Sequence, residues 1–425
     1  MIYLFKRSKK ITFPLILCLT VSIVSSQVLL DSLPIDKVET KSPPRTYPFV
    51  ISDSYSSVSA MSLVTTNYAS SMRLGFRAIS DSKLTKKQKK TAALSLQLLQ
   101  LFFFPYSHEE GHRSVLTTED IGAIATSTYD IRGVAVVKGV TDKTLMALRD
   151  DKLSTYIRLH TGGLESDFLM VKQLRTILAF EEDNYENIFS ELLLRNAGIV
   201  GYYFGSLLTT LEPKIVESSN ELENDIVGHD VYGAIRNLHR PSGKFYRYTK
   251  YDDLIGDEKN YLNTVAYLSL FNVISPKWAK FKLPNNGKIA FGTGFTMTPF
   301  GYQIELDSWI KYRNIKCLLS LHSFQNRVQN NLGLGVNFYD IGLTKNVNLD
   351  IMGNVFQQPK NLDFNTNESF TGGFLETKLK IRLPKEFKIP LELHVSGKVK
   401  SYGFVLGEPY FREGIFLKLG GALIL

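Results

Sequence analysis

From Lys288 to the last residue, hydrophobic and polar side chains alternate with a period of two, which is typical of β-strands with one apolar and one polar face. In 301–313, for example, Ile304 and Leu306 flank Glu305. Eight such segments are predicted, at 288–299, 301–313, 315–325, 331–343, 346–357, 372–384, 389–402 and 412–425. The pattern therefore predicts a C-terminal antiparallel β domain over residues 287–425.

Alternation alone does not say which face of these strands points inward. A soluble sandwich or lipocalin-type barrel buries the apolar face, whereas an outer-membrane barrel turns it to lipid. The predicted strands are long, short and long connections alternate, and the chain ends on the last strand, as a transmembrane barrel requires. A soluble β domain is the alternative.

This part resembles small bacterial outer-membrane proteins of the eight-stranded class. The resemblance implies an antiparallel eight-stranded transmembrane β-barrel in contact with outer-membrane lipid. It also implies that the preceding helical region lies in the periplasm, and that mixed-sign residues fill the barrel with ion pairs. The terminal Leu425 departs from the aromatic residue with which these proteins usually end.

Between residues 56 and 286 the hydrophobic spacing is helical. Leu164, Phe168 and Val171, for example, fall near one face of a helix. Helices are predicted at 61–79, 91–104, 164–180, 188–211 and 261–274. We interpret the most apolar of these as buried core helices, not membrane spans. The fold class expected for the whole chain is α+β, with an α-helical domain at 56–286 before the β-barrel at 287–425.

The first 26 residues have the pattern of a secretory signal peptide, because four cations precede an apolar run and small residues precede Gln27. Residues 27–55 contain several prolines without periodicity, so we expect a tether. The composition is that of a folded chain, at 44% hydrophobic and 21% charged residues. A mean hydropathy of −0.06 excludes a polytopic helical membrane protein.

The formal net charge is +9, but four of the cations belong to the predicted signal peptide. The remaining excess of positive charge is small, and the densest basic run, at 83–90, contains no interleaved aromatic residues. We therefore expect no nucleic-acid partner. A solvated loop is the simplest interpretation of this run, and contact with anionic lipid headgroups is the alternative.

Residues 108–112 read His-Glu-Glu-Gly-His, which fits the pattern H-E-x-x-H. On a helix, positions i and i+4 share a face, so His108 and His112 can bring two imidazoles to one Zn²⁺ ion. Glu109 would lie beside the open position of the metal and take a proton from water. The alternative is a polar helix start with Ser107 as N-cap and both histidines on the surface.

The motif is similar to that of the zincin metallopeptidases. The resemblance implies a zinc ion, with His108 and His112 as ligands, Glu109 as general base and a third ligand further along the chain. No third histidine follows directly, so the comparison is with the branch in which a distal glutamate supplies the ligand. Glu165, near the start of an apolar helix, is the best match there.

Two further assignments accompany this resemblance. Asp167 is a candidate partner that orients an imidazole. The alternative third ligands are Glu119, Glu181 and His160. The polar stretch 218–260, which contains His229 and His239, is predicted to be an exposed loop or an insertion on the substrate side.

Together these features predict a zinc metallopeptidase anchored in the bacterial outer membrane, with envelope proteins or peptides as substrates in the periplasm. The alternative function is that of a non-catalytic scaffold or an accessory subunit of a larger outer-membrane protein complex.

Overall fold

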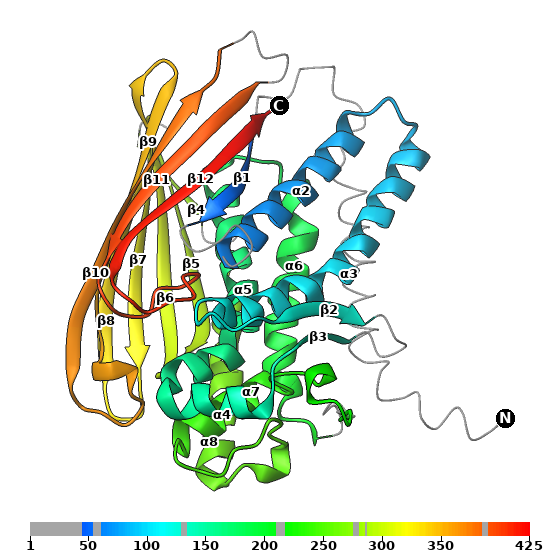
Figure 1. The fold of residues 1–425 in the computed structure, drawn as a ribbon. Coiled ribbons are helices and arrows are strands. Elements are labelled where there is room, and N and C mark those ends of the chain that lie inside the picture. Colours follow the sequence, from blue (N-terminus) through cyan, green and yellow to red (C-terminus); the bar gives the residue numbers. More distant parts are fainter. Residues whose placement is uncertain are drawn as a thin grey trace, which may run out of the picture.

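The structure is a computed structural model of the chain, and it describes residues 45–53, 61–128, 134–209, 217–274, 280–284, 287–384 and 390–425. A helical N-terminal region precedes a large antiparallel sheet (Figure 1). The predicted signal peptide at 1–26 lies outside the described residues. Residues 27–55, predicted as a tether, include a strand of the sheet, β1 (Thr46–Asp53).

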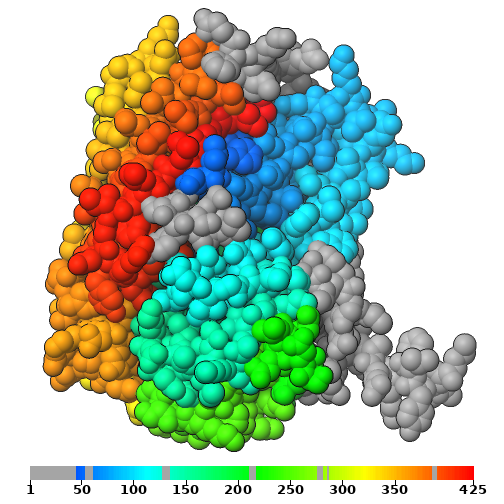
Figure 2. Space-filling view, viewed as in Figure 1, coloured from blue at the N-terminus to red at the C-terminus, as the bar shows by residue number. Residues whose placement is uncertain are grey.

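The sheet has ten strands in the order β1-β12-β11-β10-β9-β8-β7-β6-β5-β4. Its long strands match the eight predicted segments, which confirms that part of the prediction. They are β5 (Gly287–Thr298), β6 (Gly301–Tyr312), β7 (Ile315–Gln325), β8 (Asn330–Thr344), β9 (Val347–Pro359), β10 (Ser369–Arg382), β11 (Leu391–Lys400) and β12 (Gly414–Ile424). The edge strands are β1, paired with β12 in Figure 2, and β4 (Lys280–Leu283).

The described sheet is not closed, in contrast to the predicted barrel, because β1 and β4 form its two edges and do not pair with each other. Side-chain amides from the helical region bond to backbone groups near both edges. Asn67 accepts from the N–H of Val50 on β1 and donates to the carbonyl of the same residue. Asn272 makes the same two bonds with Phe295 on β5, beyond the residues of β5 that pair with β4. Helical segments thus satisfy edge groups that a closed barrel would pair with another strand.

The polar face of the sheet points inward and the apolar face points outward. On β6, Glu305 and Asp307 are buried, whereas Leu306 between them is exposed. On β11, Ser396 and Lys398 are buried, whereas Val399 is exposed. The inner face carries ion pairs, among them Lys398 with Glu376 at 2.7 Å. The predicted interior ion pairs are therefore present, although helices also fill the concave side of the sheet.

The helices are α2 (Met61–Asp81), α3 (Lys86–Thr117), α4 (Asp142–Asp151), α5 (Leu153–Phe180), α6 (Glu186–Gly205), α7 (Asp230–His239) and α8 (Gly256–Leu268). A short hairpin pairs β2 (Ile124–Thr128) with β3 (Val134–Lys138). Four 3₁₀ turns complete the described elements: η3 (Glu221–Glu223), η4 (Tyr251–Asp253), η5 (Ser269–Val273) and η6 (Lys360–Leu362). Of the helices in the described ranges, none has the length and apolar character needed to cross a membrane.

Helix α5 is the centre of the molecule. Leu164, Phe168 and Val171 are buried, as their spacing predicts, and they share a core with side chains from α6, α7, α8 and β5. Figure 1 shows the helices on the concave side of the curved sheet. The helical region is therefore packed into the sheet and does not stand apart from it. This packing brings residues that are distant in sequence to the two sides of α5.

Candidate metal centre

Helices α3 and α5 cross at glycines, which sets the position of the H-E-x-x-H motif. A Cβ atom added to Gly111 would lie 2.2 Å from the carbonyl oxygen of Gly162. No other residue type fits at this crossing without a backbone shift. Because α3 continues through Pro105 to Thr117, the motif lies on an unbroken helix that faces α5. The motif histidines are buried and do not belong to a surface helix start.

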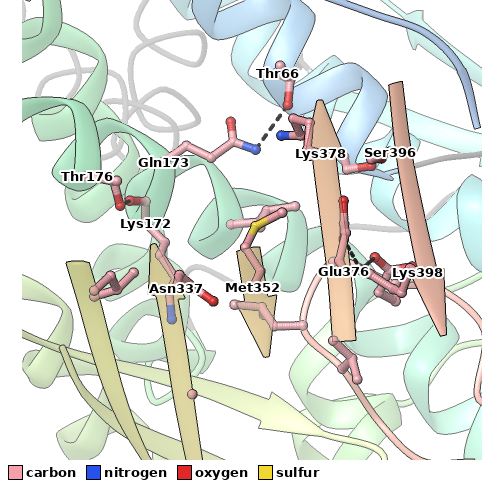
Figure 3. Close-up of a pocket in the computed structure, with 18 of the residues that line it drawn as sticks. Thr66, Lys172, Gln173, Thr176, Asn337, Met352, Glu376, Lys378, Ser396 and Lys398 are labelled. Carbon is pink, nitrogen blue, oxygen red and sulfur yellow. Dashed lines mark hydrogen bonds and ion pairs between the residues drawn. The ribbon is translucent and has the colours of Figure 1, made fainter. Parts of the chain in front are cut away.

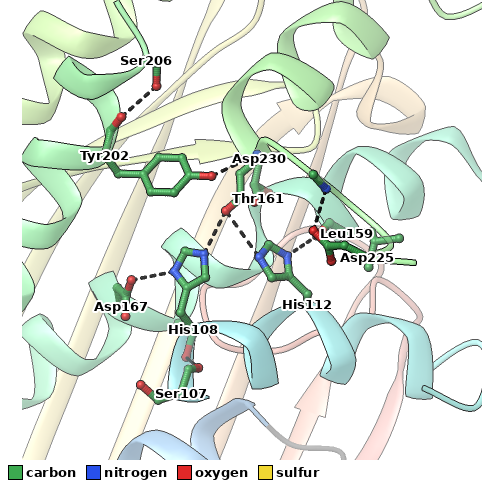
Figure 4. A network of polar contacts seen from close by, with 12 residues as sticks. Ser107, His108, His112, Leu159, Thr161, Asp167, Tyr202, Ser206, Asp225 and Asp230 are labelled. Carbon is green, nitrogen blue, oxygen red and sulfur yellow. Dashed lines mark hydrogen bonds and ion pairs between the residues drawn. The ribbon is translucent and has the colours of Figure 1, made fainter. Parts of the chain in front are cut away.

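His108, His112 and Asp230 form a buried group that could hold a metal ion (Figure 4). One ligand atom from each lies within 4.8 Å of the other two. An Asp230 carboxylate oxygen is 3.0 Å from Nε2 of His108 and 3.3 Å from Nε2 of His112. Two imidazoles and one carboxylate are the three protein ligands of many catalytic zinc sites, which keep a fourth position open.

Hydrogen bonds orient both imidazoles towards this group. Nδ1 of His108 lies 2.8 Å from a carboxylate oxygen of Asp167, so the contact predicted for Asp167 is present. Nδ1 of His112 lies 2.6 Å from the backbone carbonyl oxygen of Leu159. With an ion bound at the two Nε2 atoms, these acceptors would hold the remaining ring proton on Nδ1 of each imidazole.

Gly163 leaves room at the same place. A Cβ atom on Gly163 would lie 2.3 Å from Nε2 of His108 and 2.5 Å from Nε2 of His112. Bonds between Zn²⁺ and imidazole nitrogen are about 2.0–2.1 Å long. Glycine at 163 therefore lets α5 approach both Nε2 atoms, which the methyl group of any other residue would crowd. The donor types and their orientation fit a bound metal ion.

A chain of buried charges supports the imidazole of His108 from behind. Asp167 forms an ion pair with Arg195 on α6, and Arg195 pairs with Glu191 at 2.6 Å. Glu191 in turn accepts a hydrogen bond of 3.0 Å from the hydroxyl of Tyr68 on α2. Because this series of contacts links residues of α2, α3, α5 and α6, rotation of His108 would disturb the packing of four helices.

Glu109 lies beside the two motif histidines and has no hydrogen-bond or ion-pair partner among the described residues. Burial raises the pKa of Glu109 to about 8, and the nearby imidazoles of His112 and His108 oppose that rise. Asp230 behaves differently. Burial alone would raise its pKa, but His112 and His108 hold the pKa of this carboxyl far below its usual range. One carboxylate of the site therefore pairs with the imidazoles, while the other has no partner.

Glu165, the predicted third ligand, lies outside this group. It forms a fully buried ion pair with Arg158 at 2.5 Å and accepts the backbone N–H of Gly407 at 2.8 Å. The alternatives are also elsewhere. Glu119 pairs with Lys152, Glu181 pairs with Lys288, and both ring nitrogens of His160 lack a hydrogen-bond partner. Asp230, and not Glu165, therefore lies beside the two histidines, in the position predicted for the third ligand.

Asp230 lies within the stretch 218–260, which the sequence analysis interpreted as a loop or insertion. Asp230 is instead the first residue of α7, a buried helix packed on α5. Asp225, from the same stretch, lies near His112, and one of its carboxylate oxygens is buried without a partner. Asp230 follows His108 by 122 residues, and no local spacing rule connects the two. The helical spacing of Val231, Ala234, Ile235 and Leu238, at i, i+3, i+4 and i+7, was the available signal for a buried helix here.

Comparison of the chain with protein-family models, curated proteins and solved structures gave no match.

Proposed function

We propose that this protein is a zinc-dependent peptidase that is anchored in the bacterial outer membrane and acts on envelope proteins. The observation that carries the proposal is the convergence of His108, His112 and Asp230 beside Glu109, a carboxylate without a partner. A structural zinc site usually has four protein ligands, whereas three ligands and an adjacent base are typical of hydrolytic sites.

Each residue of the site has a separate role in this proposal. His108, His112 and Asp230 would hold the ion, and Asp167 and the carbonyl of Leu159 keep the two imidazoles in place. When bound, zinc would act as a Lewis acid towards water and a peptide carbonyl. Glu109 would accept the proton of the attacking water and donate it to the leaving amine.

Elemental analysis of the detergent-purified chain tests the metal site. We expect about one zinc per wild-type chain. His112→Ala should lose it because one donor is removed, and Gly163→Ala should lose it because the added methyl group would displace both Nε2 atoms, which lie within 2.5 Å of its position. Gly201→Ala is the matched control, since a Cβ there meets nothing within 4 Å. Absence of zinc from wild-type protein purified without chelator would contradict the enzyme proposal and favour a scaffold.

The outward apolar face of the sheet supports the membrane part of the proposal. Exposed aliphatic side chains recur along the outer face of neighbouring strands, for example Leu332 at 67%, Val399 at 60% and Ile415 at 75%. Soluble monomers rarely expose a continuous apolar surface of this kind.

Tryptophan fluorescence in vesicles made of brominated phosphatidylcholine tests this contact. Tryptophan placed at Leu417, on the outer face of β12, should be strongly quenched because bromine quenches at short range. Tryptophan placed at the neighbouring Phe416, on the inner face, should not be quenched. The quenching measured for the wild-type protein gives the background signal. Equal emission from the Leu417 variant in brominated and ordinary lipid would show that the sheet does not face the bilayer.

A further inference from the structure

A cavity lies between α5, α2 and the concave face of the sheet, and it has a volume of about 430 Å³. This volume is within the range of small-molecule binding sites. Figure 3 shows that polar side chains from both layers surround it, with Thr66 and Gln173 on the helices and Glu376, Lys378 and Ser396 on the strands. The cavity contains none of the candidate zinc ligands.

Lys378 stands out among the charged side chains of this cavity because it has no hydrogen-bond or ion-pair partner in the described part of the chain. Its carboxylate neighbours pair with other cations. Glu376 pairs with Lys398 at 2.7 Å, and Asp350, opposite Lys378 on β9, pairs with Lys380 at 2.7 Å. An ammonium group inside a protein is costly without a counter-charge. An anion in the cavity would supply that charge.

Further hydrogen-bonding groups surround the same space. Ser396 is the direct cross-strand partner of Lys378 on β11 and lines the cavity with it. On the helical side, the buried hydroxyl of Ser62 has no hydrogen-bond partner. Gln173 donates to Thr66 at 3.1 Å and retains its amide oxygen for a donor group on a ligand. Met352 adds an apolar wall.

We propose that this cavity binds a small anionic molecule, whose carboxylate or phosphate group pairs with Lys378 and whose body lies between Ser396, Met352 and the α2–α5 side. The proposal is independent of the metal centre. Leu169, Lys172 and Gln173 of α5 line the cavity, whereas Gly163 and Asp167 adjoin the histidines on a different face of that helix. The ligand is therefore not the peptide substrate at the candidate zinc site.

Isothermal titration calorimetry of the detergent-purified full chain with succinate and with inorganic phosphate tests the proposal. Sodium chloride at matched ionic strength serves as the reference. We expect at least one probe to bind with a Kd of about 1 mM or tighter. Lys378→Met should weaken this binding by about tenfold or more, because the paired charge is lost. Lys143→Met, which removes an exposed lysine from α4, should bind as wild type does.

The melting temperature separates loss of binding from loss of fold. Without ligand, Lys378→Met should melt no lower than wild type, since the substitution removes a charge that has no partner. Binding of phosphate alone would assign a phosphate ligand, and binding of succinate alone a carboxylate ligand. Absence of binding for both probes, or unchanged binding by folded Lys378→Met, would overturn the proposal.

Discussion

Replacing Glu109 by glutamine is expected to lower kcat for hydrolysis of a fluorescein-labelled casein by about 10²–10⁴-fold, the usual contribution of a general base. Glutamine keeps the size of the side chain but cannot accept the proton of the attacking water. Because Glu109 is not among the three candidate ligands, zinc content should stay near the wild-type value. Cleavage rates and elemental analysis of the same preparations measure both quantities.

Glu119→Gln is the matched control for this variant. Glu119 follows α3 and pairs with Lys152 at the surface, so the same substitution there should leave both activity and zinc unchanged. If Glu109→Gln hydrolyses casein at the wild-type rate with zinc bound, Glu109 is not the base. If wild type and variant are equally inactive while zinc is bound, the centre holds metal without turning over this substrate.

Replacing Arg158 by methionine is expected to lower the free energy of unfolding by about 3–5 kcal/mol, as measured by urea titration of the detergent-solubilised chain. Arg158 and Glu165 are both fully buried, so the variant leaves a carboxylate in the interior without its counter-charge. The guanidinium group also donates to the carbonyl of Val405 at 3.0 Å and lies over the Phe404 ring at 4.6 Å. The substitution therefore also weakens the attachment of the β11–β12 connection to α5.

Lys152→Met provides the comparison, because it breaks an exposed ion pair with Glu119 that should contribute at most about 1 kcal/mol. Glu165→Gln should also destabilise the chain yet retain zinc, since Glu165 lies outside the candidate ligand group. A folded Glu165→Gln variant that has lost its zinc would instead make Glu165 a ligand. A loss below about 1 kcal/mol for Arg158→Met would show that this ion pair does not hold the connection.

The strand positions could be predicted from the sequence because alternation is a local property. Each of the eight predicted segments overlaps one of the long strands β5–β12, with boundaries that differ by at most three residues. The two edge strands could not be found in this way. β1 lies among the prolines of the predicted tether, and β4 has only four residues, too few for a pattern to be clear. Their pairing depends on long-range contacts with β12 and β5.

Closure of the sheet is also a tertiary property. Eight long strands with one apolar face are compatible with a barrel, but whether the first and last strands meet depends on what lies between them. In this chain helices occupy the concave side, and the Asn67 and Asn272 amides take the place of a neighbouring strand at Val50 of β1 and at Phe295 of β5. Neither asparagine is distinguishable in the sequence from an ordinary polar residue of a helical segment.

In the candidate metal centre too, the local geometry could be predicted from the sequence, whereas the long-range contacts could not. The sequence by itself determined that His108 and His112 share a helix face and that Glu109 adjoins them, because one helical turn sets that geometry. It also indicated Asp167 as a partner. Only the tertiary structure decided the third candidate ligand. Packing of α7 on α5 brings Asp230 to the histidines and leaves Glu165 to pair with Arg158, and contacts across such distances depend on the whole core.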